Sequence, residues 1–71
     1  MLEKYNPFVD ANGTTIIYFG KTLISIRKKI KNYNVKVYKG GVTECDKPLV
    51  LEFSTIEEVE LFLEIIFEYS N

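Results

Sequence analysis

Most of the chain between residues 14 and 53 alternates between apolar and polar positions, and this period of two indicates β-strands. The first such segment, 14–19, is rich in β-branched and aromatic residues. Gly20-Lys21 follows it, and a glycine at the first central position is what a type II′ hairpin turn requires. We therefore predict that residues 22–30 return as the second strand of a hairpin.

Two more alternating segments, 35–39 and 49–53, follow a turn predicted at 32–34 and a polar loop predicted at 40–48. If all four segments are strands, one set of side chains gathers on a common, mainly apolar face. That set consists of Thr15, Ile17, Phe19, Ile24, Ile26, Ile30, Val35, Val37, Leu49, Leu51 and Phe53. The pattern predicts an antiparallel sheet of three or four strands, joined as a β-meander.

Residues 22–30 also admit a helix, because Leu23, Ile26 and Ile30 are spaced three to four positions apart. A helix there would produce the order β-α-β-β-α, a truncated ferredoxin-like fold. We prefer the strand because it extends the common apolar face through the later segments.

Residues 1–13 are predicted to be an irregular N-terminal segment, since Pro7 and Asn12-Gly13 interrupt regular structure. Within this segment, Phe8-Val9 has an alternative as a short edge strand that forms a hairpin with the strand after it. In either case the main part of the sheet occupies residues 14–53.

The sequence predicts an acidic amphipathic helix over residues 54–69. Ser54-x-x-Glu57 and Thr55-x-x-Glu58 both match the capping box, in which side chains satisfy backbone N–H groups at a helix start. At about 100° per residue, four glutamates share one stripe and six apolar residues share the opposite face. The acidic stripe is Glu57, Glu60, Glu64 and Glu68, and the apolar face is Ile56, Val59, Phe62, Leu63, Ile66 and Phe67. We predict an α+β fold in which this helix packs across one face of the sheet.

Leu61, Ile65 and Tyr69 fall outside the apolar helix face and widen the apolar arc past half of the circumference. A helix that lies on a single sheet needs an apolar stripe of about 100° or somewhat more. The excess predicts either a second interface, with another copy or another protein, or a cover supplied by the N-terminal segment through Tyr5 and Phe8.

With 71 residues, the chain is expected to form a single domain, 1–71, and a core of that size rarely supplies more than roughly 3–5 kcal/mol net. Small domains often gain further stability from disulfides or a metal. Cys45 is the single cysteine and there is no histidine, so neither an internal disulfide nor a zinc site is expected. We therefore expect a protein partner or self-association as a homodimer.

Charge is distributed unevenly along the chain. Residues 1–50 contain nine basic and four acidic residues, whereas residues 51–71 contain six glutamates and no base. The net charge of −1 therefore conceals opposite local charges of +5 and −6. Such an asymmetry bears on the choice of partners rather than on the fold.

The leading functional hypothesis is a small non-enzymatic protein-interaction module, an inhibitor or adaptor, that uses the acidic helix. A stripe of four glutamates without a lysine at i+4 is unusual, because like charges at this spacing destabilise a helix. The alternative is an ordinary solvated helix face. The candidate partner-binding residues are Glu57, Glu60, Leu61, Glu64, Ile65 and Glu68. Size and composition are consistent with a phage or mobile-element gene product.

A second hypothesis is single-stranded nucleic-acid binding on the sheet face that the helix leaves open. Bases stack on aromatic rings, and Lys and Arg neutralise phosphates. The candidates are Tyr18, Arg27, Lys29, Lys36 and Tyr38. The net charge of −1 counts against avid phosphate binding. The alternative without a ligand is an ordinary solvated sheet face whose lysines prevent aggregation. A structural subunit of a larger assembly is the third hypothesis.

Catalysis is not expected, because the chain has no histidine to act as a general base. Cys45 lies between Glu44 and Asp46, whose charges disfavour the reactive thiolate. We predict no enzyme activity, no cofactor, no metal and no small-molecule substrate.

No apolar run approaches the roughly 20 residues of a membrane span, and the start has no signal-peptide core. We therefore expect a cytoplasmic protein that does not bind membranes.

Overall fold

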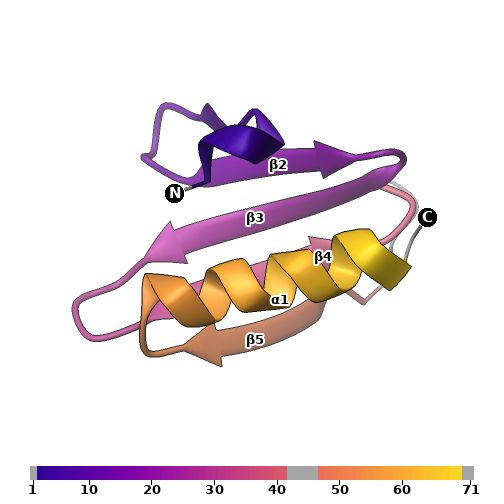
Figure 1. Ribbon diagram of the computed structural model, residues 1–71. Coiled ribbons are helices and arrows are strands. Elements are labelled where there is room, and N and C mark those ends of the chain that lie inside the picture. The colour runs from indigo at the N-terminus through magenta and orange to yellow at the C-terminus, as the bar shows by residue number, and fades with distance from the viewer. Residues whose placement is uncertain (1, 42–46, 70–71) are drawn as a thin grey trace.

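A computed structural model describes residues 2–41 and 47–69. The elements are the 3-10 helix η1 (Glu3–Tyr5), strands β1 (Phe8–Val9), β2 (Thr15–Phe19), β3 (Thr22–Lys28), β4 (Tyr33–Tyr38) and β5 (Leu49–Phe53), and helix α1 (Ile56–Tyr69). The strands form one antiparallel sheet in the order β1-β2-β3-β4-β5, and both η1 and α1 lie on the same side of it (Figure 1). The predicted α+β class and the meander order are confirmed.

The sheet has five strands rather than three or four, and the additional strand is β1. Asp10 Oδ1 accepts hydrogen bonds from the N–H groups of Asn12 and Thr14 at 2.9 and 3.0 Å, which closes a tight loop. Gly13 completes this loop with a φ of 80° that a glycine adopts without strain. The loop brings Phe8 opposite Ile16, so the edge-strand alternative is confirmed and the prediction of irregular structure is wrong there.

The predicted hairpin between β2 and β3 is confirmed, with Phe19 paired to Thr22 across a two-residue turn. Gly20 has a φ of 61°, whereas Lys21 is not among the residues with positive φ. A type I′ turn needs positive φ at both central positions, so this pattern identifies the predicted type II′ turn. The helix alternative for residues 22–30 is wrong, because residues 22–28 form β3.

The core lies between the sheet and α1. Its buried residues are Ile17, Ile24, Ile26 and Val35 from the sheet and Val59 and Leu63 from α1. The sheet residues belong to two cross-strand pairs, Ile17 with Ile24 and Ile26 with Val35. The alternating pattern therefore predicted the covered side of the sheet correctly at these positions.

Three sequence predictions are corrected near the strand ends. Ile30 does not join the core but is 99 % exposed, because β3 ends at Lys28 and the chain then turns. The turn comes earlier than predicted, with the Lys29 N–H bonded to the Asn32 carbonyl at 2.7 Å and with residues 33 and 34 already in β4. Leu49 is more than half exposed because it opens the edge strand β5, which has a neighbour on only one side.

Helix α1 begins after a capping box at Thr55 and Glu58. Thr55 Oγ1 accepts from the Glu58 N–H at 3.3 Å, and Glu58 Oε1 accepts from the Thr55 N–H at 3.2 Å. The Ser54 N–H also donates to Glu58 Oε1 at 3.2 Å. Of the two candidate boxes, the structure therefore forms the one at Thr55.

Helix α1 does not cover the whole sheet, contrary to the prediction. It packs mainly on β4 and β5, while η1 lies over the other end of the same side (Figure 1). The two helices meet at Phe67, whose ring centroid lies 4.6 Å from that of Tyr5 and 3.8 Å from that of Phe19. Part of the cover is thus supplied by the N-terminal segment.

The predictions for the centre of the 40–48 loop, including Cys45, and for the side chain of Tyr69 lie outside the described residues.

Candidate functional site

The side of the sheet opposite α1 and η1, called here the open face, is an array of cross-strand rows. Residues in register project to the same side of a sheet, so the pairing defines each row. The rows are Tyr18, Leu23 and Tyr38; then Phe8, Ile16, Ser25, Lys36 and Val50; then Arg27, Asn34 and Glu52. Rings and apolar side chains therefore occupy one end of the open face, and polar groups occupy the other.

Two tyrosines define the aromatic end. Tyr18 is 67 % exposed, Tyr38 is half-buried, and Leu23 lies between them on the central strand β3. Neighbouring strands are about 4.8 Å apart, so the two tyrosines stand about 10 Å apart across the sheet. Such a spacing offers two separate stacking surfaces rather than one stacked pair.

The polar end contains a hollow of about 210 Å³. Its lining residues all carry polar groups, and they are Thr14, Ser25, Arg27, Lys29, Asn34, Lys36 and Tyr38. The side-chain oxygen of Asn34 is inaccessible and has no hydrogen-bond partner among the described residues. Tyr38 belongs to the aromatic row and also lines this hollow, so its ring lies beside the three cations of the hollow.

The three cations of this hollow, Arg27, Lys29 and Lys36, form no ion pair with any residue that the structure describes. Glu52 is the acid of the open face rows, and it accepts a hydrogen bond from Asn32 Nδ2 at 3.3 Å. Among the residues that the structure describes, no carboxylate therefore neutralises these cations, and they are exposed to a ligand. Sequence analysis named all three, and the register brings them together with Tyr38.

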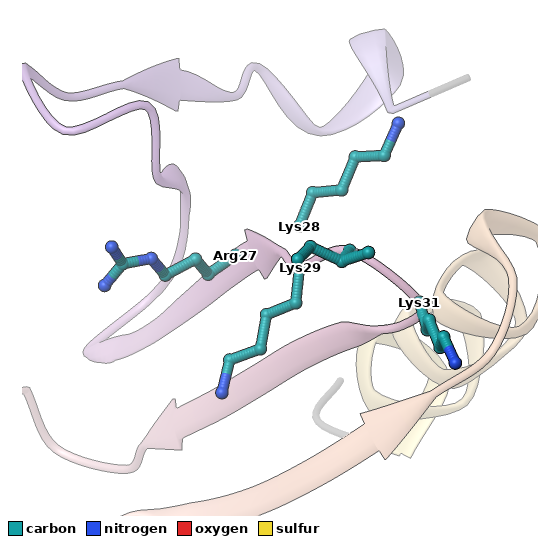
Figure 2. Close-up of a pocket in the computed structure, with 5 residues that line it drawn as sticks. Arg27, Lys28, Lys29 and Lys31 are labelled. Carbon is teal, nitrogen blue, oxygen red and sulfur yellow. The ribbon is translucent and has the colours of Figure 1, made fainter.

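Sequence analysis did not single out the rest of the turn between β3 and β4. Residues 27–31, called here the basic turn, contain four cations in five positions and line a wide, shallow depression. Figure 2 shows Arg27 and Lys29 on one side of the chain, Lys28 on the opposite side and Lys31 on the returning segment. The sequence contains this run of basic residues. Its exposed apolar member, Ile30, was missed because the predicted strand extended to residue 30 and assigned Ile30 to the core.

The acidic stripe of α1 lies on the side of the helix that faces η1. Lys4 Nζ lies 3.4 Å from Glu64 Oε1, and the two side chains form an ion pair between the N-terminal segment and the helix. A hydrogen bond to Tyr5, followed in strength by one to Glu64, raises the pKa of Lys4 above its ordinary value. Glu57 and Glu68 are exposed, whereas Glu60 is half-buried. The stripe is thus partly engaged within the protein.

Leu61 and Ile65 are 60 % and 51 % exposed and lie on the outer side of α1. The N-terminal segment reaches Phe67 through Tyr5, and Phe8 is itself exposed. The cover that the sequence predicted for the widened apolar arc therefore reaches only the end of the apolar helix face, and it leaves Leu61 and Ile65 exposed.

Within the described ranges, no three His, Cys, Asp or Glu side chains come together in a way that would hold a metal ion. In the same ranges, no helix combines the length and the apolar character needed to cross a bilayer.

Comparisons with protein-family models, with curated proteins and with solved structures found no match to this chain. The functional argument therefore depends on the geometry described above.

Proposed function

We propose that this protein binds single-stranded nucleic acid on its open face. The observation that carries the proposal is a sheet face that neither α1 nor η1 covers. On it, Tyr38 borders three cations that form no ion pair with a described residue, and Tyr18 stands in the same cross-strand row as Tyr38. The ligand-binding residues in this proposal are Tyr18, Arg27, Lys29, Lys36 and Tyr38. The second hypothesis from the sequence is therefore the one that the geometry supports best.

The two parts of the open face suit the two parts of a nucleotide chain. Stacking of a base on an aromatic side chain contributes about 1–3 kcal/mol and tolerates any base, because every base has a π-face. The cations of the hollow suit phosphates, and the release of counterions adds binding free energy that does not depend on sequence. We therefore expect weak selectivity among bases and preference for single strands, whose bases are free to stack.

The net charge of −1 does not oppose this proposal as strongly as the sequence suggested. The protein extends 20 Å even along its shortest principal axis, and α1 lies on the side of the sheet opposite the open face. At physiological ionic strength, the Debye length is about 8 Å, so charges at opposite surfaces are largely screened from each other. A phosphate at the open face therefore experiences mainly the charges of that face, which are Arg27, Lys29 and Lys36 together with the single negative charge of Glu52.

Titration of a labelled single-stranded oligonucleotide, followed by fluorescence anisotropy, tests the proposal. Three phosphate contacts predict a slope of log K against log salt of about −2 between about 20 and 200 mM salt. Tyr18→Ala should weaken binding about tenfold with little change in that slope, because it removes a stacking surface and no charge. Absence of binding at the lower salt concentration would contradict the proposal.

A matched pair of lysine variants separates the hollow from general charge. Lys36→Gln removes a cation of the hollow, and Lys21→Gln removes one from the β2–β3 turn outside it. We expect Lys36→Gln to reduce the magnitude of the salt slope by about 0.7 and Lys21→Gln to leave it nearly unchanged. Equal effects of the two variants would indicate diffuse attraction rather than a site.

A second candidate function is protein binding through the helix flank, which is favoured by the exposure of Leu61 and Ile65 beside the acidic stripe. The flank comprises Glu57, Glu60, Leu61, Glu64, Ile65 and Glu68. A symmetric dimer through this flank would bring two acidic stripes together, so a partner with a basic and apolar surface suits it better than a second copy.

Calorimetric titration with an amphipathic peptide that carries Lys and Leu on one helix face tests the helix flank. Leu61→Ser with Ile65→Ser should abolish binding, because the apolar contact is lost while the charge is kept. Arg27→Gln with Lys36→Gln is the control and should leave peptide binding unchanged. Sedimentation over a range of concentrations tests self-association separately.

A further inference from the structure

Ile30 is the most exposed of the large apolar side chains in the described part of the protein, at 99 %. It stands between Lys29 and Lys31, within the basic turn. Because this side chain is not buried, it adds nothing to the hydrophobic stabilisation of the fold, and water surrounds it completely in the free protein. An apolar side chain held out among cations is suited to an anionic ligand that also offers an apolar surface.

Two hydrogen bonds hold the basic turn, one across it and one from its returning side to β5. The Lys29 N–H donates to the Asn32 carbonyl at 2.7 Å, and Asn32 Nδ2 donates to Glu52 Oε2 of β5 at 3.3 Å. The first bond closes the turn, and the second ties Asn32 to the neighbouring edge of the sheet. Ile30 is presented without a large cost of ordering the backbone on binding.

The cations of the basic turn do not lie on a single side. Arg27 and Lys29 project with the open face, while Lys28 projects from the opposite side of the same strand (Figure 2). A flat bilayer surface would meet only one of these sets. Two phosphate chains that diverge around the turn would meet both, and this arrangement favours nucleic acid over an anionic membrane.

We propose that the basic turn binds the junction between duplex and single-stranded nucleic acid, with Ile30 packed as a wedge against the last base pair. This proposal depends on the proposed function, because the single strand leaving the junction continues over the open face to Tyr38 and Tyr18. Apolar side chains such as Ile are used in this way by proteins that unstack base steps. Lys28 contacts the second strand, whose phosphates the open face does not reach.

The test compares three labelled probes: a single strand, a blunt duplex, and the same duplex carrying the single strand as a tail. We expect the wild-type protein to bind the tailed duplex about tenfold more tightly than either other probe. Ile30→Ser should remove this preference and leave the affinity for the single strand within about twofold. Ile30→Leu is the matched control and should keep the preference, since it preserves an apolar wedge.

A 2-aminopurine base at the junction supplies a second readout, because its fluorescence rises when the base is unstacked. The rise should occur with the wild-type protein and with Ile30→Leu, and it should be lost with Ile30→Ser. Both variants change a fully exposed position, so their folding should match that of the wild type, and circular dichroism checks this.

Different failures have different meanings. If the wild type binds the single strand and shows no preference for the tailed duplex, the junction proposal is overturned and the proposed function stands. If no probe binds at low salt, both proposals fail. If Ile30→Ser instead abolishes cosedimentation with vesicles containing phosphatidylserine while all probes bind equally, the turn is a membrane contact and the junction proposal is wrong.

Discussion

The two faces of the sheet differ in almost every physical property, although the same strands form both. On β3, Ile24 and Ile26 point to the covered face and are buried, while Leu23, Ser25 and Arg27 point to the open face and are half-buried or exposed. The covered face contributes the stability of the domain. The open face carries rings and cations, which a core would exclude because a buried cation without a partner is very costly.

Under the proposed function, this division lets one small sheet provide both stability and binding with little conflict between them. A substitution on the covered face should change stability, and one on the open face should change binding. The predictions below test that separation, beginning with the largest expected effect.

Ile24→Ala should cost about 3–4 kcal/mol of unfolding free energy, because it leaves a cavity among fully buried neighbours. That loss is comparable to the whole stability expected of a domain of this size. Its neighbour Leu23 faces the other side and is half-buried, so Leu23→Ala should cost about 1 kcal/mol. Urea denaturation followed by circular dichroism measures both values, and equal costs would contradict the assignment of the faces.

Charge reversal on the two sides should affect nucleic-acid binding very differently. Lys36→Glu should weaken binding of a single strand about tenfold or more, because it places a negative charge in the hollow. Glu68→Lys lies on α1 and should change the affinity by less than about twofold near 0.15 M salt, where the Debye length is about 8 Å. Near 0.01 M salt the Debye length is about 30 Å, and Glu68→Lys should then tighten binding. Anisotropy titrations at the two concentrations provide the measurement.

The capping box allows a stability test that should not affect the open face. Thr55→Ala removes the side-chain oxygen that accepts from the Glu58 N–H and should cost about 1 kcal/mol. Ser54→Ala should cost only about a few tenths of a kcal/mol, because Ser54 contributes its backbone N–H rather than its hydroxyl. Thermal unfolding compares the two variants. A larger loss for Ser54→Ala would mean that the other candidate box forms in solution.

The smallest expected effect concerns the ion pair between η1 and α1. Tyr5 first and then Glu64 raise the pKa of Lys4 in the folded protein. The stabilisation by charged Lys4 is therefore complete below the ordinary value of 10.5 and is lost as the pH rises through the folded-state pKa. Both side chains of the pair are more than half exposed, and the gain is therefore small. Between pH 9 and pH 11.5, the melting temperature of wild type should fall slightly more than that of Lys4→Met. An equal fall in the two proteins would show that the pair contributes nothing.

Local patterns in the sequence predicted much of this molecule. The bounds of β5 match the predicted segment 49–53, and the apolar face of α1 contains the two helix residues that are fully buried. The type II′ turn followed from Gly20, whose φ of 61° meets the requirement of that turn. Each of these features depends on residues close together in the chain, and for that reason a pattern of neighbours is sufficient to predict them.

The candidate site was predicted only in part. Tyr18, Arg27, Lys29, Lys36 and Tyr38 were assigned to the open face by alternation. Alternation did not show that Tyr38 would border the hollow formed with the three cations, because that requires the register between β3 and β4. Ile30 was misplaced because the strand was extended by two residues beyond Lys28, and a side chain past the end of a strand has no core to enter.

The sequence by itself determined which side chains share a face, because the period of a strand or helix is a local property of the backbone. Only the tertiary structure decided how much of that face is covered. Helix α1 packs on β4 and β5, while η1 lies over the other end, where the ring of Tyr5 contacts that of Phe67 in α1. Burial depends on contacts between segments that are far apart in the chain. The same contacts leave the open face, Ile30 and the outer side of α1 in water, where a ligand can reach them.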